Sequence, residues 1–389
     1  MEMQVAIDGI WYSLDPVYKQ ATVIKSQDEE YEGNITIPSS LLYEGLVYEV
    51  MRIDDEAFFC CYNLSSVIIS EGVIEIGFAA FDSCTELQSI CLPKSLEEIG
   101  LAAFRNCYNL LNITIPCNVI EILGGTFESC VKLESIDLLG NIEEIGNGAF
   151  YGCASLRSLS IPQSLVKIGE KAFGECGSLY EVVLSENIKE IPSAIFKGCT
   201  SLINVNIPDG VRAINEEAFS YCRNLKNVVI PNSVERIKQY AFSSCESLSS
   251  IIVPDGVTDI ERGVFLECVN LTSVILPNGL VKIGDFAFSR CVNLMSVILP
   301  TSLQYIGAYA FSCCSIHSVT MPENMIHVMD FAFSDCSELL DVYCCAEKVS
   351  FTSNAFDLSA ITLHVPEGAV EKYKSAEPWC KFGKIVSSQ

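Results

Sequence analysis

Residues 237–254 read Ile-Lys-Gln-Tyr-Ala-Phe-Ser-Ser-Cys-Glu-Ser-Leu-Ser-Ser-Ile-Ile-Val-Pro. The template I-x-x-x-A-F-x-x-C-x-x-L-x-x-[VI]-x-[IVL]-P recurs along almost the whole chain. Its Phe stands at positions 58, 81, 104, 127, 150, 173, 196, 219, 242, 265, 288, 311, 333 and 356. Twelve of the thirteen intervals are 23 residues long, and the interval from Phe311 to Phe333 is 22. A fixed period of this length is the signature of a stacked-repeat protein.

Each copy of the template has three parts, which we number relative to its Phe as position 0. Position −5 is Ile in the first twelve copies, for example Ile76 and Ile168, and belongs to an extended segment. Ala, Phe, Cys and Leu at −1, 0, +3 and +6 have the spacing that places side chains on one face of a short helical turn. The run L-x-x-V-x-I puts its Val and Ile on one side of a strand. The Pro at +12 then ends that strand, because it lacks an N–H group.

Successive copies return the chain to its starting position, so their strands are expected to pair in parallel. We predict an α/β repeat fold: a solenoid with a parallel β-sheet and short helical or 3-10 turns, with about 14 repeats over residues 53–366. Residues 1–52 do not match the template but contain strand-like segments at 5–12, 21–24, 34–37 and 46–53, which predict a β-rich N-terminal cap. In residues 367–389, Val370 and Tyr373 share a helical face and Trp379 and Phe382 follow, which predicts a short helical C-terminal cap.

The charge balance disfavours polyanionic partners. The chain has 24 Lys and Arg residues against 49 Asp and Glu, for a net charge of −25. Such a surface repels nucleic acid and anionic membranes, so neither is expected as a partner. We see no apolar run long enough to cross a bilayer, so we expect no membrane insertion. The first eight residues show no signal peptide.

Twenty cysteines suggest at first a disulfide scaffold, but their positions argue against it. Thirteen occupy one repeat position, three residues after each Phe from Phe58 to Phe333. A Cys at a fixed repeat position is most simply a small, buried, apolar side chain. Stacked side chains that point the same way also have poor geometry for a disulfide. We therefore expect free thiols and a reducing or anaerobic setting.

No constellation of residues points to catalysis, a metal or a cofactor. The three histidines, His317, His327 and His364, stand at different repeat positions, and no nucleophile and base recur around them. The vicinal cysteine pairs lack the spacing of a zinc site. Gly77 and Gly100 recur at one repeat position and are interpreted as turn residues, not as a phosphate-binding loop. We predict a non-enzymatic protein with no catalytic residue, no metal and no cofactor.

What remains is the outward face of the predicted sheet. If the aliphatic residue at +9 points inward, positions +8 and +10 point outward. Position +8 is a mostly small polar series, the Ser/Asn row, which we interpret as a hydrogen-bonding ladder that could alternatively accept a glycan. Position +10, the outward row, is mixed at first and then becomes apolar. The candidate partner-binding residues are Val183, Val229, Ile252, Ile275, Ile298, Met295 and Tyr343.

Four consecutive repeats carry Val229, Ile252, Ile275 and Ile298, which we call the aliphatic strip. At about 4.8 Å between strands, four rungs make an apolar strip about 15 Å long. Contiguous exposed apolar surface usually marks an interaction site. The alternative is that β-branched residues simply form strands well.

The repeat resembles that of BspA-type leucine-rich-repeat proteins over residues 53–366, and the segments DGI-Y and VPEGAVEKYK resemble the flanks of that family. The family is a group of surface proteins common in oral and gut anaerobes. The resemblance implies a leucine-rich-repeat solenoid and an adhesin-like module that binds host matrix or cell-surface proteins. It also implies a cell-surface or secreted location, with a cytoplasmic one as the alternative because no signal peptide is visible. The alternative functions are a glycan-binding module that uses the Ser/Asn row and an intracellular protein-interaction scaffold.

Overall fold

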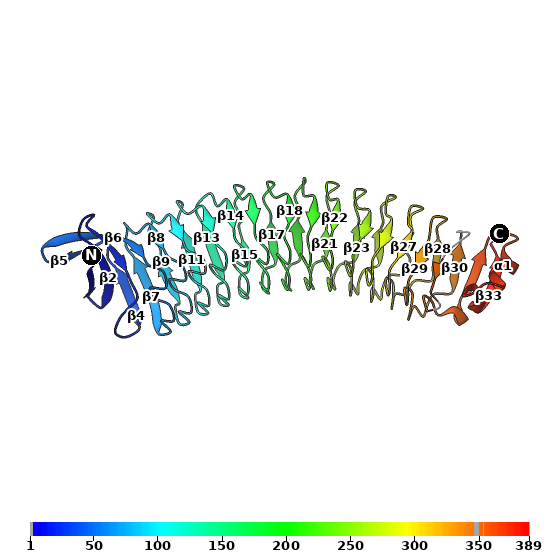
Figure 1. Ribbon diagram of the computed structural model, residues 1–389, viewed down its shortest axis with the longest axis horizontal. Helices are drawn as coiled ribbons and strands as arrows, with labels where there is room; N and C mark the ends of the chain where they lie inside the picture. The colour runs from blue at the N-terminus through cyan, green and yellow to red at the C-terminus, as the bar shows by residue number, and fades with distance from the viewer. Residues whose placement is uncertain (1–2, 346–349, 353, 389) are drawn as a thin grey trace. The chain divides into compact units, whose positions relative to one another are not determined.

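The computed structural model describes residues 3–345, 350–352 and 354–388 and consists of two compact units. The first unit comprises Met1–Ile188 and Gly198–Thr200, and the second comprises Lys189–Lys197 and Ser201–Gln389. Within each unit the chain winds as a coil, and each turn of the coil contributes strands that lie beside those of the next turn (Figure 1). The predicted solenoid of parallel strands is confirmed within each unit.

The first unit begins with strands that do not follow the template: β1 (Met3–Ile7), β2 (Ile10–Asp15), β3 (Gln20–Val23), β4 (Gly33–Ile37), β5 (Ser40–Tyr43) and β6 (Leu46–Ile53). The pairs β1–β2, β2–β3 and β5–β6 are antiparallel. The segment 5–12 predicted as one strand is a hairpin, because Asp8 and Gly9 have φ angles of 50° and 81° and reverse the chain. β4 and β6 pair in parallel with the first strands of the repeats, and β3 pairs in parallel with β6, so parallel pairing already begins at residue 20.

Most repeats contribute one strand around position +9; among the described residues, the repeat of Phe288 has none there. In the first unit these strands are β7 (Leu64–Ile69), β9 (Ser89–Cys91), β11 (Asn112–Ile115), β13 (Ser135–Leu138), β15 (Ser158–Leu159) and β17 (Glu181–Val183). In the second unit they are β19 (Asn204–Asn206), β21 (Asn227–Val228), β23 (Ser250–Ile252), β25 (Ser273–Ile275), β28 (Ser318–Met321) and β30 (Asp341–Cys344). Register runs from one position to the same position of the next repeat, as Ile252 opposite Ile275 shows.

A second, two-residue strand lies at positions −6 and −5. In the first unit these strands are β8 (Glu75–Ile76), β10 (Glu98–Ile99), β12 (Glu121–Ile122), β14 (Glu144–Ile145) and β16 (Lys167–Ile168). In the second unit they are β18 (Glu190–Ile191), β20 (Ala213–Ile214), β22 (Arg236–Ile237), β24 (Asp259–Ile260), β26 (Lys282–Ile283), β27 (Tyr305–Ile306), β29 (His327–Val328) and β31 (Ser350–Phe351). The isoleucines at −5 from Ile53 to Ile306 are buried, so the residues at −6, apart from the buried Ala213, face outward.

The fourteen template phenylalanines, which we call the Phe row, are the centre of the core. In the first unit the rings from Phe58 to Phe173 stack with centroids 4.7–5.5 Å apart. In the second unit the rings from Phe196 to Phe356 stack at 5.0–5.8 Å. Ring separations of this size are favourable for aromatic pairs beyond their burial. Each turn of the coil therefore contributes one ring to a continuous stack within its unit.

The segment that carries Ala, Phe and Cys is a series of turns. The predicted one-sided placement is confirmed, because Phe, Cys and Leu point into the core. Backbone bonds of the i→i−3 type, such as Cys222 N–H to Phe219 C=O (3.1 Å), close these turns. They do not continue as a helix, because positions −2 and +2 have positive φ in every repeat from Phe58 to Phe333.

The positive φ angles give the turns a hydrogen-bond ladder of their own. In the repeat of Phe219, the N–H groups of Glu217, Phe219 and Tyr221 donate to carbonyls of the next repeat at 2.8–3.0 Å. Left-handed backbone costs a non-glycine residue roughly 1–2 kcal/mol. Inter-repeat hydrogen bonds offset that cost, which explains why Glu, Tyr and Ser occupy a conformation that usually selects glycine.

Glycine recurs at position −4 for a different reason from the one that we predicted. Gly77 and Gly100 do not have positive φ, so they are not turn residues in that sense. A Cβ on Gly100 would lie 2.4 Å from the backbone carbon of Gly77 in the preceding repeat. These glycines therefore permit close approach of two turns of the coil.

The end of the second unit departs from the template. It contains a 3-10 turn η1 (Leu358–Ala360), strand β32 (Thr362–Val365), helix α1 (Val370–Lys374), a second 3-10 turn η2 (Trp379–Lys381) and strand β33 (Lys384–Ser387). Tyr373 and Phe382 are buried, in keeping with the aromatic residues expected to close this end of the core. Strand β33, which pairs in parallel with β32, was not predicted from the sequence.

Candidate binding surface

The outward face of the +9 strands in the second unit is built by simple alternation. In β23 the side chains of Ser250 and Ile252 are exposed and Ile251 between them is buried. Because β23 and β25 pair in register, Ser250 lies opposite Ser273 and Ile252 lies opposite Ile275. The face thus presents two parallel rows two residues apart, one of serines and one of isoleucines.

The aliphatic strip is strongly exposed along its length. The exposed fractions of its residues are 80% for Val229, 63% for Ile252, 56% for Ile275 and 88% for Ile298. In the described part of the chain, no strand is assigned between β26 and β27, so Ile298 extends the row from a segment outside the sheet. Four consecutive repeats therefore present a β-branched apolar side chain to solvent.

The structure places the other predicted residues differently. Val183 is exposed, but it belongs to the first unit. Met295 is exposed three residues before Ile298, and its carbonyl accepts the N–H of His317 at 3.2 Å. Tyr343 is only 37% exposed, and the polar Thr320 of the preceding repeat lies opposite it in register. Met295 thus lies in the same repeat as Ile298, whereas Tyr343 is separated from Ile298 by a repeat that carries Thr320.

Sequence reasoning missed the partner of Tyr343. The ring of His364 stacks on the Tyr343 ring with centroids 4.3 Å apart. His364 Nε2 also lies 2.7 Å from Asp341 Oδ1, so the carboxylate fixes the imidazole. Register brings these residues together, because Asp341 and Tyr343 of β30 pair with Thr362 and His364 of β32. The only sequence signal was strand alternation at both sites.

The Ser/Asn row does not form the hydrogen-bonding ladder that we predicted throughout. Ser66 does donate to Asn34 Oδ1 at 2.6 Å. Within the described residues, however, Ser250 and Ser273 have no side-chain hydrogen bond. Beside the strip, these hydroxyls are therefore free to meet a partner.

The cysteine row is structural. Every cysteine of the chain is a free thiol, as predicted. Each thiol of the row from Cys84 to Cys336 lies 3.1–3.2 Å from the carbonyl of the Phe one repeat earlier and donates to it. Burial raises the pKa of Cys268 to about 12. A thiol held protonated in this way is a poor nucleophile.

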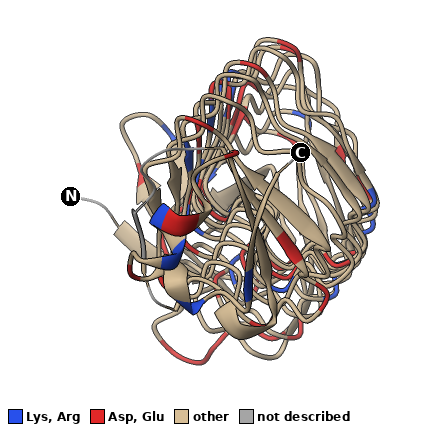
Figure 2. Ribbon diagram, turned by 90° about the vertical axis from the view of Figure 1, so that its right-hand side faces the viewer, with Lys and Arg blue, Asp and Glu red and all other residues tan. Residues whose placement is uncertain are grey.

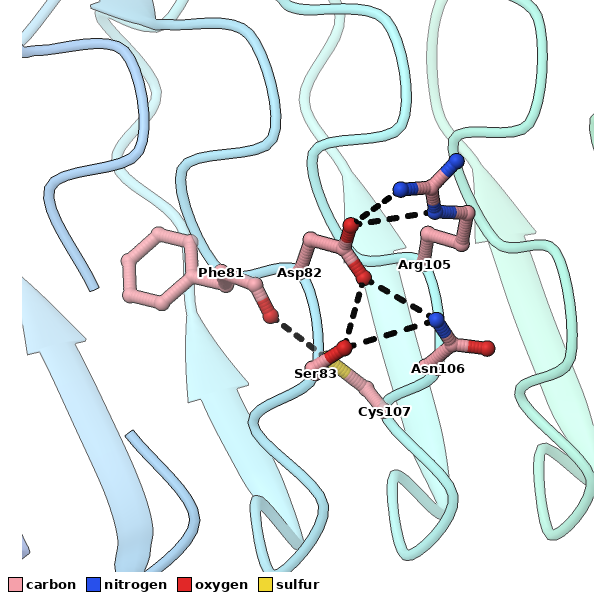
Figure 3. Close-up of polar contacts among 6 residues, drawn as sticks. All are labelled: Phe81, Asp82, Ser83, Arg105, Asn106 and Cys107. Carbon is pink, nitrogen blue, oxygen red and sulfur yellow. Dashed lines mark hydrogen bonds and ion pairs between the residues drawn. The ribbon is translucent and has the colours of Figure 1, made fainter. Parts of the chain in front are cut away.

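One buried carboxylate in the first unit is also structural (Figure 3). Asp82 is 1% exposed, and its Oδ2 accepts from Arg105 Nε at 3.0 Å. Its Oδ1 accepts from Ser83 and Asn106 at 3.0 and 3.1 Å. The hydrogen bonds to Asp82 raise the pKa of Arg105 above its ordinary value. With both oxygens occupied, Asp82 links two successive turns of the coil and has no free lone-pair direction for a substrate.

Other classes of site have little support in the described residues. Within residues 3–345, 350–352 and 354–388, no group of three or more His, Cys, Asp or Glu is arranged to hold a metal ion. The same ranges contain no helix with the length and apolar character needed to span a bilayer. Acidic residues are spread around the ribbon and do not gather on one face (Figure 2). The outward face with the aliphatic strip is thus the strongest candidate that the sequence identified.

Comparison with known proteins places the chain. The family model described as "BspA type Leucine rich repeat region (6 copies)" matches residues 51–176, 143–272 and 258–372. A leucine-rich repeat protein of Bacteroides ovatus, of known crystal structure, is 25% identical, with 99% of this chain and 100% of that chain covered and a TM-score of 0.74. The pneumococcal vaccine antigen PcpA is 17% identical over 100% of this chain and 99% of that chain, with a TM-score of 0.57. No match is found among curated proteins.

Proposed function

Since the chain belongs to the BspA-type leucine-rich-repeat family, we propose that it is an adhesin-like binding protein whose aliphatic strip docks a partner protein. The observation that carries this proposal is the exposure of four apolar side chains in four successive repeats. Leucine-rich repeats are commonly used for protein binding, and extended solenoid surfaces suit that use.

The strip differs from ordinary surface apolarity in its continuity. Isolated exposed apolar residues are normal, whereas contiguous patches usually mark interaction sites. Strand propensity alone would favour β-branched residues at +10 in every repeat, but Cys91, Asp137 and Ser160 occupy this position in the first unit. An unbroken run of four aliphatic residues at +10 therefore occurs only from Val229 to Ile298, which supports a local role.

The residues beside the strip suit close approach by a partner. Ser250 and Ser273 are small and exposed, so the isoleucine side chains beside them protrude further from the face. Their hydroxyls can donate or accept a hydrogen bond to a partner backbone. The face thus combines an apolar centre with a polar border, which is the usual anatomy of a protein interface.

The docking surface is tested with the double variant Ile252→Glu/Ile275→Glu. The unchanged protein should capture a partner from immobilised matrix proteins or from host-cell surface extract, and we expect the double variant to lose this binding. The reason is that two carboxylates buried at the interface would lack partners. The matched control is Ile68→Glu/Val183→Glu, which makes the same change at +10 in the first unit. Circular dichroism confirms that both variants fold. Equal capture by the two variants would remove the strip from the binding site.

We propose a cell-surface or secreted location on the same grounds of family membership. The test is labelling of intact cells of the source organism with a membrane-impermeant biotin reagent. Labelling of the protein, with a cytoplasmic marker unlabelled, is the expected result. A protein labelled only after lysis would favour the alternative of an intracellular interaction scaffold.

A further inference from the structure

A second surface of the second unit carries a groove that the sequence pattern did not single out. The groove has a volume of about 680 Å³ and lies over the short strands β22, β24, β26 and β27. Asp259, Lys282 and Tyr305 lie side by side in register along it, one from each successive repeat. Gly284 also lines the groove, and a Cβ there would lie 2.9 Å from the backbone carbon of Glu261 in the preceding turn.

Two of the three cations that line this groove, Arg262 and Lys282, face aromatic rings, whereas Arg236 lies 3.9 Å from Glu190. Arg262 donates from Nε to the hydroxyl of Tyr240 at 2.8 Å, and its guanidinium lies 5.1 Å from the centroid of the Phe286 ring. Lys282 Nζ lies 5.2 Å from the centroid of Tyr305. Among the described residues, neither cation has a carboxylate within ion-pair distance. These two cations therefore make no ion pair with the carboxylates that line the same groove.

Other arginines of the unit show the contrast. Arg212 pairs with Glu235 at 2.6 Å, and Arg290 pairs with Glu267 at 3.2 Å. Cations that face rings keep their remaining N–H groups available, because an aromatic face does not occupy hydrogen-bond donors in the way that a carboxylate does. The groove therefore offers unsatisfied cationic donors to a ligand.

The carboxylates that line the groove are already engaged. Glu261 Oε2 accepts the N–H of Gln239 at 3.1 Å, and Asp285 Oδ1 accepts the N–H of Ala308 at 2.9 Å. Asp259 Oδ2 accepts from Thr258 at 2.8 Å. Each of these groups keeps lone pairs that can accept a further hydrogen bond from a hydroxyl.

The rings beside the groove occupy a costly backbone position. Tyr240, Phe286 and Tyr309 all stand at position −2 with φ of 58°, a region that is exceptional for bulky side chains. The first eight repeats have Glu, Ala, Gly or Lys at this position. The Phe286 and Tyr309 rings stack with centroids 5.0 Å apart. This stacking holds in place the Phe286 ring that the Arg262 guanidinium faces.

We propose that this groove binds an acidic oligosaccharide, such as a chain that contains uronic acids. Its carboxylates would meet Arg262 and Lys282, and its hydroxyls would donate to Asp259, Glu261 and Asp285. An acidic peptide fits less well, because its repeated carboxylates would face the four acidic side chains of the groove (Glu235 is the fourth) without hydroxyl donors to offer. This site is on a different sheet from the aliphatic strip and is independent of the protein-docking proposal.

The test measures binding of hexagalacturonate and of a hyaluronan hexasaccharide to the full chain by isothermal titration calorimetry. Maltohexaose is the neutral control, and hexaglutamate is the acidic-peptide control. We expect the affinity for at least one uronate saccharide to fall by about tenfold or more in Arg262→Gln/Lys282→Gln, since charge-assisted hydrogen bonds are lost. The matched variant Arg223→Gln/Arg290→Gln removes the same charge from arginines paired with glutamates and should leave the affinity unchanged.

The outcomes distinguish a saccharide site in this groove from general charge attraction and from a peptide site. Absence of binding to both uronate saccharides overturns the proposal, as does an equal loss in the two charge-removing variants. Binding of hexaglutamate as tight as that of the saccharides would assign the groove to acidic peptides and overturn the carbohydrate class. Ile252→Glu/Ile275→Glu should bind the saccharide normally, so that failure of the protein-docking proposal does not affect this result.

Discussion

The Phe row and the outward row each receive one residue from every repeat, yet they differ in residue type and in burial. The Phe row is one residue type repeated fourteen times, and its members are buried. The outward row contains Ile68, Cys91 and Asp137 in the first unit and Val229 and Ile298 in the second, and these members are exposed. The contrast teaches that stacking fixes the inward positions, because each must fit the same neighbour above and below. The outward positions also have in-register neighbours, but their side chains extend into solvent and are therefore free to differ.

The largest expected effect is a fall in stability with rising pH, caused by the buried cysteine row. Burial raises the pKa of Cys61 to about 11 and that of Cys176 to about 12. In the unfolded chain thiols ionise from about pH 8.5, whereas in the folded chain these stay protonated. The unfolded state therefore binds fewer protons than the folded state above that pH, so stability falls as pH rises. Each buried thiol lowers the free energy of unfolding by about 1.4 kcal/mol per pH unit, and the contributions of the thiols in the cysteine row add.

This dependence is measured by urea unfolding under reducing, anaerobic conditions between about pH 7 and pH 11. Stability should be constant, as far as the thiols are concerned, below about pH 8.5 and fall steeply above it. Cys61→Ala/Cys176→Ala should reduce the slope by about 2.7 kcal/mol per pH unit. A stability curve that stays flat to pH 11 would show that the thiols do not remain protonated in the fold.

The second prediction compares the two rows directly. Phe219→Ala should destabilise the second unit by roughly 3–5 kcal/mol, because it opens a cavity in a continuous stack of rings. Ile252→Ala, on the outward row, should change stability by no more than about 0.5 kcal/mol. Urea unfolding followed by circular dichroism measures both. Similar losses for the two variants would mean that the outward row contributes to packing and that the contrast is wrong.

The smallest expected effect distinguishes two kinds of glycine. Gly148→Ala meets only an ordinary contact, 3.7 Å from the Cβ of Tyr151, and is strained by its φ of 59°. It should cost about 1 kcal/mol, as expected for a left-handed residue. Gly100→Ala forces two turns of the coil apart and should cost about 1–3 kcal/mol. Thermal unfolding of the two variants gives the order, and a larger loss for Gly148→Ala would contradict the close-approach role of Gly100.

Much of the fold could be predicted because the repeat gives many copies of the same signal. The parallel strands, the buried Phe and Cys rows and the free thiols all follow from a period of 23 residues. The hydrogen bond from each cysteine to the preceding Phe carbonyl was not foreseen, since a small apolar side chain would have explained the same pattern. The strand β33 lies outside the template, where only weak local propensity was available.

The candidate site was less predictable. Alternation indicated that Ile252 and Ile275 face outward, and their exposure agrees. It could not reveal that His364 stacks on Tyr343, because β32 lies beyond the regular repeats. Nor could it reveal the groove of Arg262 and Lys282, whose character depends on which cations lack a carboxylate partner in space.

The sequence alone determined the period, the direction of strand pairing and the identity of the inward rows, because burial in a stack constrains residue type at every copy. Only the tertiary structure decided the backbone of the turns. Positive φ at positions −2 and +2 is adopted by residues as different as Glu217 and Tyr221, so residue type does not predict it. The conformation is selected by N–H groups that must reach the carbonyls of the next repeat, and that partner exists only once the coil has closed on itself.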